Sequence, residues 1–324
     1  VLCHLPSAIC PLSSAICHLQ SAIRLQQSRA PSTALAPTLS PMRRTLVTLI
    51  ALLATLSACG GDNAATTTAA TSGVFPADAF AFVASSDLAI GSERLLVAVS
   101  DTNGARLPSP EIPVTITVWL DGREADTQVL PADFIWAIPD VSGLYKVNPE
   151  FDVPGIWVVS LQPDGGSPLE EFPIQVQESP LTVAVGETAP LSDSATLADA
   201  PIEEISSATH PDPSIYEMSI ADAVTSGRPS VIVFATPKFC QTAICGPTLD
   251  RVLEVKPSYP DVNFLHVEVF SNLDDPENLA TVPAVTEWGL PTEPWVFVVD
   301  ADGIVVARFE GVFDAAELAE ALIG

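Results

Sequence analysis

Two closely spaced cysteines directly follow an apolar run, and this junction constrains the fold more than any other part of the 324-residue chain. The apolar run is Val231–Ala235, and the cysteines are Cys240 and Cys245. The remaining cysteines all lie at or before residue 59. A buried strand fixes the position of the residues next to it in the chain, and a helix N-terminus stabilises a thiolate. The junction therefore predicts a strand that delivers two cysteines to the start of a helix.

Alternating strand and helix patterns surround the junction from residue 213 to residue 324. Apolar residues three and four apart indicate helices, and short β-branched runs indicate strands. Asp314 is the expected N-cap of the last helix. The predicted order is a short helix at 219–226, a strand at 230–235, a helix at 248–255, a strand at 262–270, a loop plus helix at 275–288, strands at 295–299 and 304–309, and a helix at 314–323.

This order, with cysteines after the first strand, resembles the thioredoxin fold and implies an α/β thioredoxin-like domain over residues 213–324. The segment Glu293–Gly303 resembles the part of that fold in which a cis-proline opens the strand facing the active site. Pro294 lies six residues before Asp300, as in the extracytoplasmic TlpA-like thioredoxins. The resemblance implies a cis Pro294 beside the substrate, since a cis bond leaves the preceding carbonyl and N–H free for pairing. A trans proline that begins the strand is the alternative.

The chain departs from that family in two places. The spacing is Cys-x4-Cys rather than Cys-x2-Cys, and five residues of regular helix rise about 7.5 Å, beyond the roughly 7 Å Cα limit for a disulfide. Either the helix begins at Pro247, leaving both cysteines in a loop, or it begins near Cys240 and Pro247 kinks it. The second departure is the absence of the Asp that thioredoxins bury in the preceding strand, since Val231–Phe234 is wholly apolar.

The resemblance implies thiol–disulfide exchange without a cofactor or a bound metal. Cys240 is the predicted nucleophile, because it follows the strand first and Lys238 lies two residues earlier to favour the thiolate. Cys245 is the predicted resolving thiol. The expected partners are exported protein substrates and an unidentified redox partner. A static disulfide that closes a loop is the alternative in an oxidising compartment.

A peroxiredoxin is a second enzyme class with which the motif can be compared. Some peroxiredoxins use a Cys-x4-Cys pair preceded by Thr-Pro, with the Thr three residues before the reactive cysteine. Here Thr236 lies four residues before Cys240, and Pro237 occupies the three-before position. Peroxiredoxins also carry an arginine where this chain has Pro294. Both differences argue against peroxidase chemistry.

Two further hypotheses do not require an enzyme. Sco-type copper chaperones share the fold and a close cysteine pair, and two thiolates can hold Cu(I). They add a distant histidine, whereas the chain after residue 59 has only His210 and His266. His266 lies in an apolar run and is expected to be a core or strand residue. The other hypothesis is a surface adaptor whose thioredoxin-like domain is inactive in redox chemistry.

Residues 75–178 predict an all-β domain before the thioredoxin-like one. Short strands alternate with turn signals such as Asn103-Gly104, a pattern typical of a β-sandwich. Gly143-Leu-Tyr145 followed by Pro154-Gly-Ile-Trp157 resembles small immunoglobulin-like modules of bacterial surface proteins, including the YtkA-like group. Three tryptophans are expected in its core: Trp119, Trp136 and Trp157. Residues 179–212, rich in Pro, Ser, Ala and Thr, predict a linker.

The N-terminal region predicts export and lipid anchoring. Met42-Arg-Arg44 is a positive n-region, and residues 46–56 form an apolar stretch too short to span a bilayer. Leu56-Ser-Ala-Cys59 resembles the lipobox of bacterial lipoproteins, which implies a signal peptide at 42–58 and acylation of Cys59. Residues 1–41, which carry a seven-residue repeat, are then expected to be a mis-assigned upstream extension. Residues 59–74 predict a flexible tether.

The charge of the remaining chain excludes one class of partner. All 40 acidic residues lie after Cys59, against nine basic ones, which gives a net charge of −31. A surface this acidic does not attract nucleic acid or an anionic membrane face. The sequence therefore predicts an extracytoplasmic protein held at the cell membrane through a lipid on Cys59, with a sandwich followed by a thioredoxin-like domain.

Overall fold

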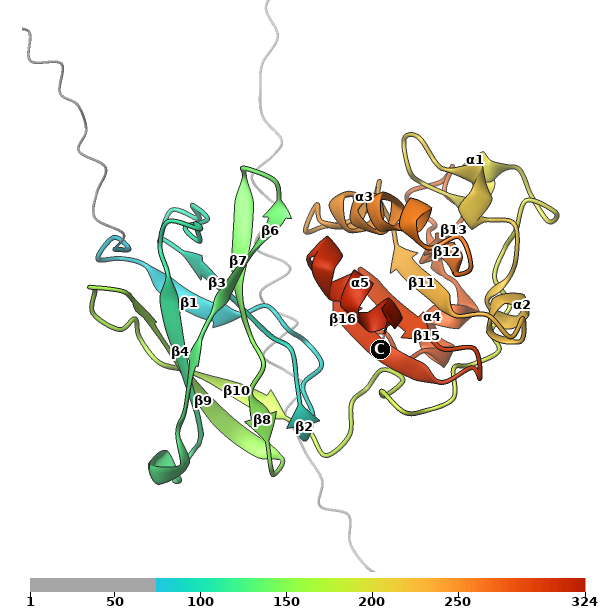
Figure 1. The fold of residues 1–324 in the computed structure, drawn as a ribbon. Helices are drawn as coiled ribbons and strands as arrows, with labels where there is room; N and C mark the ends of the chain where they lie inside the picture. The colour runs from blue at the N-terminus through green and yellow to red at the C-terminus, as the bar shows by residue number, and fades with distance from the viewer. Residues whose placement is uncertain (1–73, 324) are drawn as a thin grey trace, which may run out of the picture. The chain divides into compact units, whose positions relative to one another are not determined.

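The computed structural model describes residues 74–323 of the chain (Figure 1). The predicted upstream segment 1–41, the signal peptide 42–58, Cys59 and the tether up to residue 73 lie outside the described residues. The described residues all belong to one compact unit. No helix in this part of the chain has the length and apolar character needed to cross a membrane.

Two four-stranded antiparallel sheets form the first half of the described chain and enclose one apolar core. One sheet has the order β1 (Phe80–Val83), β3 (Leu95–Ser100), β7 (Ser142–Val147), β6 (Asp133–Ile138). The other has the order β10 (Phe172–Val176), β9 (Gly155–Pro163), β4 (Val114–Leu120), β5 (Gln128–Pro131). Three short elements complete this half: β2 (Gly91–Ser92), which pairs with β8 (Glu150–Phe151), and the 3-10 helix η1 (Glu124–Asp126).

Strict alternation along the strands decides which side chains enter this core. On β4, Val114, Ile116 and Val118 are buried, so Trp119 points to the opposite face and is only half-buried. Trp136 on β6 lies on the same face as Phe134, which packs against this core, but Trp136 itself is only half-buried and is not part of the core. The prediction that all three tryptophans lie in the core is therefore right only for Trp157.

The second half is built on a mixed four-stranded sheet with helices on both faces (Figure 1). Its order is β12 (Asn263–Glu268), β11 (Ser230–Ala235), β15 (Trp295–Val299), β16 (Val305–Glu310), with β11 and β12 parallel and the other pairs antiparallel. The remaining elements are α1 (Ile202–Ile205), η2 (Pro213–Ile215), α2 (Ile220–Val224), α3 (Cys245–Val255), η3 (Lys256–Ser258), β13 (Phe270–Ser271), β14 (Ala280–Thr281), α4 (Pro283–Glu287) and α5 (Ala315–Ile323).

The apolar strand β11 is buried on both faces. Val231, Val233 and Ala235 share one core cluster with residues of α3 and α5. Ile232 and Phe234 point the other way, into a second cluster with residues of α2 and α4. This two-sided burial explains why the strand is continuously apolar rather than alternating.

The strands and helices predicted from residue 219 onward are present, in the predicted order. The short helix α2 begins after Ser219, whose hydroxyl accepts from the Asp222 N–H in a capping box. Asp314 precedes α5, and its N–H donates to the Glu317 carboxylate. The Ser219 cap fixes where α2 begins, as the sequence indicated. At Asp314 no hydrogen bond from a described helix N–H to the side chain is present, and the link to α5 is made by the backbone N–H of Asp314.

The segment 179–212 is packed against the second half of the chain. Ala189 is buried, Thr188 forms a bridge with Ile304, and the Trp288 indole donates to the Ser192 hydroxyl at 3.2 Å. These contacts make the segment an ordered connection.

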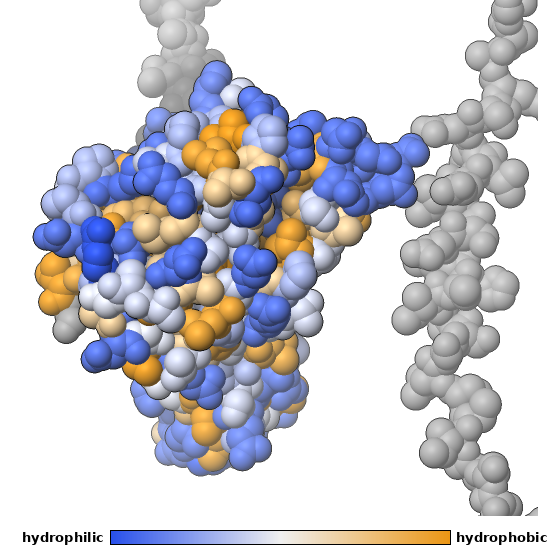
Figure 2. Space-filling model, turned by 90° about the vertical axis from the view of Figure 1, so that its right-hand side faces the viewer, coloured by the Kyte–Doolittle hydropathy of each residue, from blue (hydrophilic) through white to orange (hydrophobic). Residues whose placement is uncertain are grey.

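Figure 2 shows one face of the molecule, on which hydrophilic residues predominate and apolar ones lie between them.

Arg308 on β16 is the centre of a buried ion-pair cluster. Its guanidinium lies 2.7 Å from the carboxylates of both Asp87 and Glu93 and donates to the Thr182 hydroxyl. The Asp87 side chain is fully buried and also accepts the N–H groups of Leu181 and Thr182. Burial raises the pKa of Glu93, and the charge of Arg308 opposes that rise. The cluster holds residues of the first half against the last strand of the sheet.

Arg308→Met is expected to lower the free energy of unfolding by roughly 3–5 kcal/mol, because it leaves the buried Asp87 carboxylate without a counter-charge. Arg123→Met is the matched control. It removes ion pairs with the exposed Asp126 and Asp152, which contribute little. Urea unfolding followed by tryptophan fluorescence measures both variants. Equal midpoints for the two would contradict a stabilising role for the Arg308 cluster.

Candidate functional site: the Cys240–Cys245 pair

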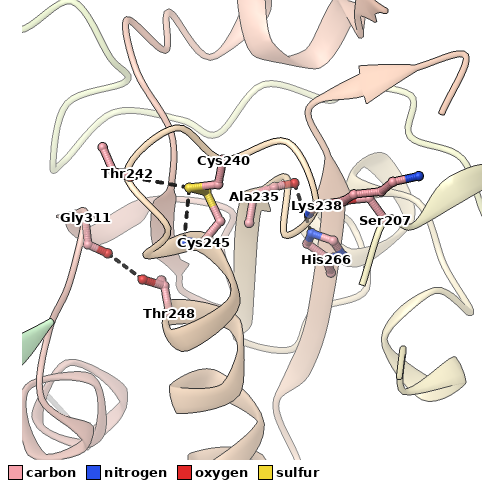
Figure 3. The surroundings of a disulfide bond; sticks show 9 residues. All are labelled: Ser207, Ala235, Lys238, Cys240, Thr242, Cys245, Thr248, His266 and Gly311. Atoms are coloured by element: carbon pink, nitrogen blue, oxygen red, sulfur yellow. Dashed lines mark hydrogen bonds between the residues drawn. A yellow bond between two sulfur atoms is a disulfide. The ribbon is translucent and has the colours of Figure 1, made fainter. Parts of the chain in front are cut away.

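Cys240 and Cys245 form a disulfide between the loop that follows β11 and the first residue of α3 (Figure 3). Their Cα atoms are 6.0 Å apart, within the range that a disulfide allows. The pair can close because the five-residue step is not regular helix. Ala243 has a left-handed φ of 61°, which turns the chain before Cys245.

The start of α3 distinguishes between the two predicted geometries. The helix begins at Cys245, so the alternative in which it begins near Cys240 is wrong. It also begins two residues earlier than Pro247, so the prediction that both cysteines lie in the preceding loop is right only for Cys240. Pro247 occupies the first turn, where a missing N–H costs nothing. The Thr248 hydroxyl then donates to the Gly311 carbonyl at 2.9 Å and ties α3 to the segment after β16.

The two sulfurs lie in different environments. Cys240 is half-buried, and its sulfur accepts the Cys245 N–H at 3.2 Å. The Thr242 hydroxyl lies 3.4 Å from the same sulfur and is the donor, because a disulfide sulfur carries no hydrogen. Cys245 is completely buried in the apolar cluster that contains Leu249. A negative charge on Cys240 is therefore stabilised by two donors and the helix N-terminus, whereas one on Cys245 is desolvated.

Lys238 does not supply one of these donors. Its N–H donates to the Ser207 hydroxyl, and its ammonium lies 5.1 Å from the centre of the Phe239 ring. Figure 3 shows the Lys238 side chain extending away from the disulfide. In this arrangement Lys238 contributes to holding the loop, and the groups next to the Cys240 sulfur are those of Thr242 and Cys245.

The segment before β15 lies beside the disulfide. The Glu293–Pro294 peptide bond is cis, as predicted, and Pro294 is buried. A carboxylate oxygen of Glu293 and the two sulfurs all lie within 4.8 Å of one another. In the sequence Glu293 stands out only as the neighbour of Pro294, and its closeness to the cysteines was not predicted. Its position directly before the predicted cis-proline is the signal that could have found it.

Glu293 is half-buried, and desolvation raises the pKa of its carboxyl group. It lines a cavity of about 350 Å³ whose other walls are uncharged. These walls are formed by Val269, Phe270, Thr281, Val285, Thr286, Leu290, Pro291 and Thr292. The carboxyl group therefore faces the sulfurs from a neutral, partly apolar setting.

The histidines do not complete a copper site of the expected kind. His266 is buried, with Nδ1 2.6 Å from the Tyr216 hydroxyl and Nε2 3.1 Å from the Ala235 carbonyl. Nε2 donates to the carbonyl, so Nδ1 accepts from Tyr216, and both ring nitrogens are engaged within the core. His210 is exposed in a loop. The residues that could hold a metal, once the disulfide is reduced, are Cys240, Cys245 and Glu293.

The sequence matches no protein-family model and no protein with a curated description. The functional assignment therefore rests on the geometry of the cysteine pair and its neighbours.

His266 makes a specific contribution to the pH dependence of stability. Desolvation lowers its pKa to about 4, from 6.5 for an ordinary histidine. Because the unfolded chain takes up the proton first, stability is fully present above pH 6.5 and is lost as the pH falls toward 4. The expected loss is roughly 3 kcal/mol. Urea unfolding at several pH values measures it, and His266→Gln should remove most of the slope in this window. An equal slope in that variant would assign the effect to other groups.

Proposed function

We propose that the second half of the chain is a thioredoxin-like domain that exchanges thiols and disulfides with exported proteins through Cys240 and Cys245. The observation that carries this proposal is the asymmetry of the pair. Cys240 is accessible and receives two hydrogen bonds, whereas Cys245 is fully buried. This is the arrangement that an attacking and a resolving thiol need. The element order and the position of Pro294 support the same assignment.

A place for a substrate strand exists next to the pair. Among the described residues, neither the backbone N–H nor the carbonyl of Glu293 has a hydrogen-bond partner. An extended client segment can therefore pair with this peptide while its cysteine reaches Cys240. We assign to Pro294 the role of presenting this peptide to the client. We also propose that the first half of the chain is an immunoglobulin-like sandwich.

The main test of the proposal is the trapping of clients. Cys245→Ser is expected to accumulate mixed disulfides between Cys240 and client proteins, because the resolving thiol is gone. Cys240→Ser, the matched control, should accumulate none, since Cys245 is buried. Non-reducing gels of extracts from cells expressing each variant measure the outcome. Failure of both variants to trap a client would favour a surface adaptor with a structural disulfide.

The reactivity and potential of the isolated pair give an independent test. In the reduced protein Cys240 should be alkylated before Cys245, as mass spectrometry of short iodoacetamide exposures can show. In glutathione buffers the pair should show a reduction potential above about −300 mV. Structural disulfides have potentials below this value. A potential below that limit, with equally slow alkylation of both cysteines, would contradict the exchange function. One equivalent of bound copper, lost in either cysteine variant, would favour a metallochaperone.

We further propose that the protein is anchored at the extracytoplasmic face of the cell membrane through Cys59. The support is the motif Leu56-Ser-Ala-Cys59 after an apolar stretch. Mass spectrometry of the mature protein is expected to find an acylated N-terminal Cys59 and no peptide from residues 1–41. Cys59→Ala should abolish acylation. Recovery of intact upstream peptides would contradict both the anchor and the late start at Met42.

A further inference from the structure

We infer that Glu293 is the proton donor and acceptor for the buried cysteine of the pair. The inference rests on the proposed exchange function and names a residue that the thioredoxin resemblance does not supply. A carboxylate oxygen of Glu293 lies within 4.8 Å of both sulfurs. General acid–base catalysis covers such a separation after a side-chain rotation or through one water molecule.

The need for a proton arises from the burial of Cys245. When a client attacks Cys240, the Cys240–Cys245 bond breaks and Cys245 leaves as a thiolate. Cys245 is completely buried among apolar side chains, where a thiolate is poorly solvated. The Cys245 N–H does not relieve this charge, because it points to the Cys240 sulfur. A proton delivered to the Cys245 sulfur during bond cleavage makes it a neutral thiol, so no buried charge forms.

Glu293 is suited to hold that proton. Desolvation is the only cause that raises the pKa of its carboxyl group, and no charged side chain contributes. The cavity that it lines contains no other charged residue. Among the described residues, its carboxylate forms no ion pair or hydrogen bond that would hold it in the charged form. Both sulfurs lie within 4.8 Å of one of its carboxylate oxygens.

The other buried acid near the end of β11 is less suited to this role. Glu268 lies opposite Ala235 in the parallel pair of strands, and one of its oxygens accepts the Ser207 N–H at 2.8 Å. Burial raises its pKa as well. It is not among the ligand-type groups gathered at the sulfurs, whereas Glu293 is. The geometry therefore selects Glu293.

The step balances in atoms, charge and electrons. The thiolate of a client dithiol attacks the Cys240 sulfur and forms the mixed disulfide. The electron pair of the broken S–S bond goes to the Cys245 sulfur, which takes the proton of neutral Glu293 and becomes a thiol. Glu293 becomes a carboxylate, so one negative charge is present before and after. The second client thiol gives its proton to solvent and attacks the client sulfur of the mixed disulfide, and Cys240 leaves as a thiolate. The client is then oxidised and the protein reduced by two electrons. In the reverse direction Glu293 takes the proton from Cys245.

The test is the pH dependence of disulfide reduction by dithiothreitol, which needs no client. In the wild-type protein the rate, divided by the concentration of dithiothreitol thiolate, should fall as the pH rises through the raised pKa of Glu293. Glu293→Gln keeps the size of the side chain but has no acidic proton. Its rate at low pH should be about 100-fold lower, and the fall with pH should disappear.

Glu287→Gln is the matched control, because Glu287 is exposed on α4 and the substitution makes the same change in charge. It should retain the wild-type rate and pH profile. The assignment would be overturned if Glu293→Gln kept the wild-type pH dependence of the reduction rate, or if the wild-type rate did not fall as the pH rises. Either result would count even if Cys245→Ser traps clients. Conversely, a rate in Glu293→Gln that no longer falls with rising pH supports the assignment even if no client is trapped. The role of Glu293 and the exchange function can therefore fail separately.

Discussion

The burial of β11 on both faces is the constraint on which the cysteine site depends. Its side chains alternate between two core clusters, so a shift in register would exchange the residues of both clusters. The chain therefore leaves the sheet at a fixed point after Ala235. From there Ser207 holds the N–H of Lys238, and α3 packs back against the same cluster with Cys245 as its first residue. The position of both sulfurs thus follows from the packing of one strand.

The elements around the site were predictable because their signals are local. The apolar run of β11 and the cap at Ser219 each lie within a few residues of the element they define. The start of α3 at Cys245 was not predictable to the residue. It depends on the left-handed conformation of Ala243, which no residue preference at that position indicates.

Contacts between distant segments account for the features that the sequence did not show. Glu293 lies about fifty residues after the cysteines in the chain, and only the fold brings its carboxyl group to them. The segment 179–212 has the small and polar residues of a linker, yet Ala189 and Ser192 pack on the second half of the chain. Short side chains whose apolar members do not recur at a regular spacing give no sign in the sequence that they pack. Lys238, by contrast, was close in sequence but extends away from the sulfurs (Figure 3).

The acid near the sulfurs lies on the loop before β15 and not in the apolar strand β11. A carboxyl group within β11 would be buried on either face and would need a hydrogen-bond partner inside the core. Glu293 lies instead on the loop before β15, where it is half-buried and open to exchange protons with solvent. It can therefore reach the buried Cys245 without placing a charge in the core. The strand keeps the packing that fixes the sulfurs, and the loop supplies the group that titrates.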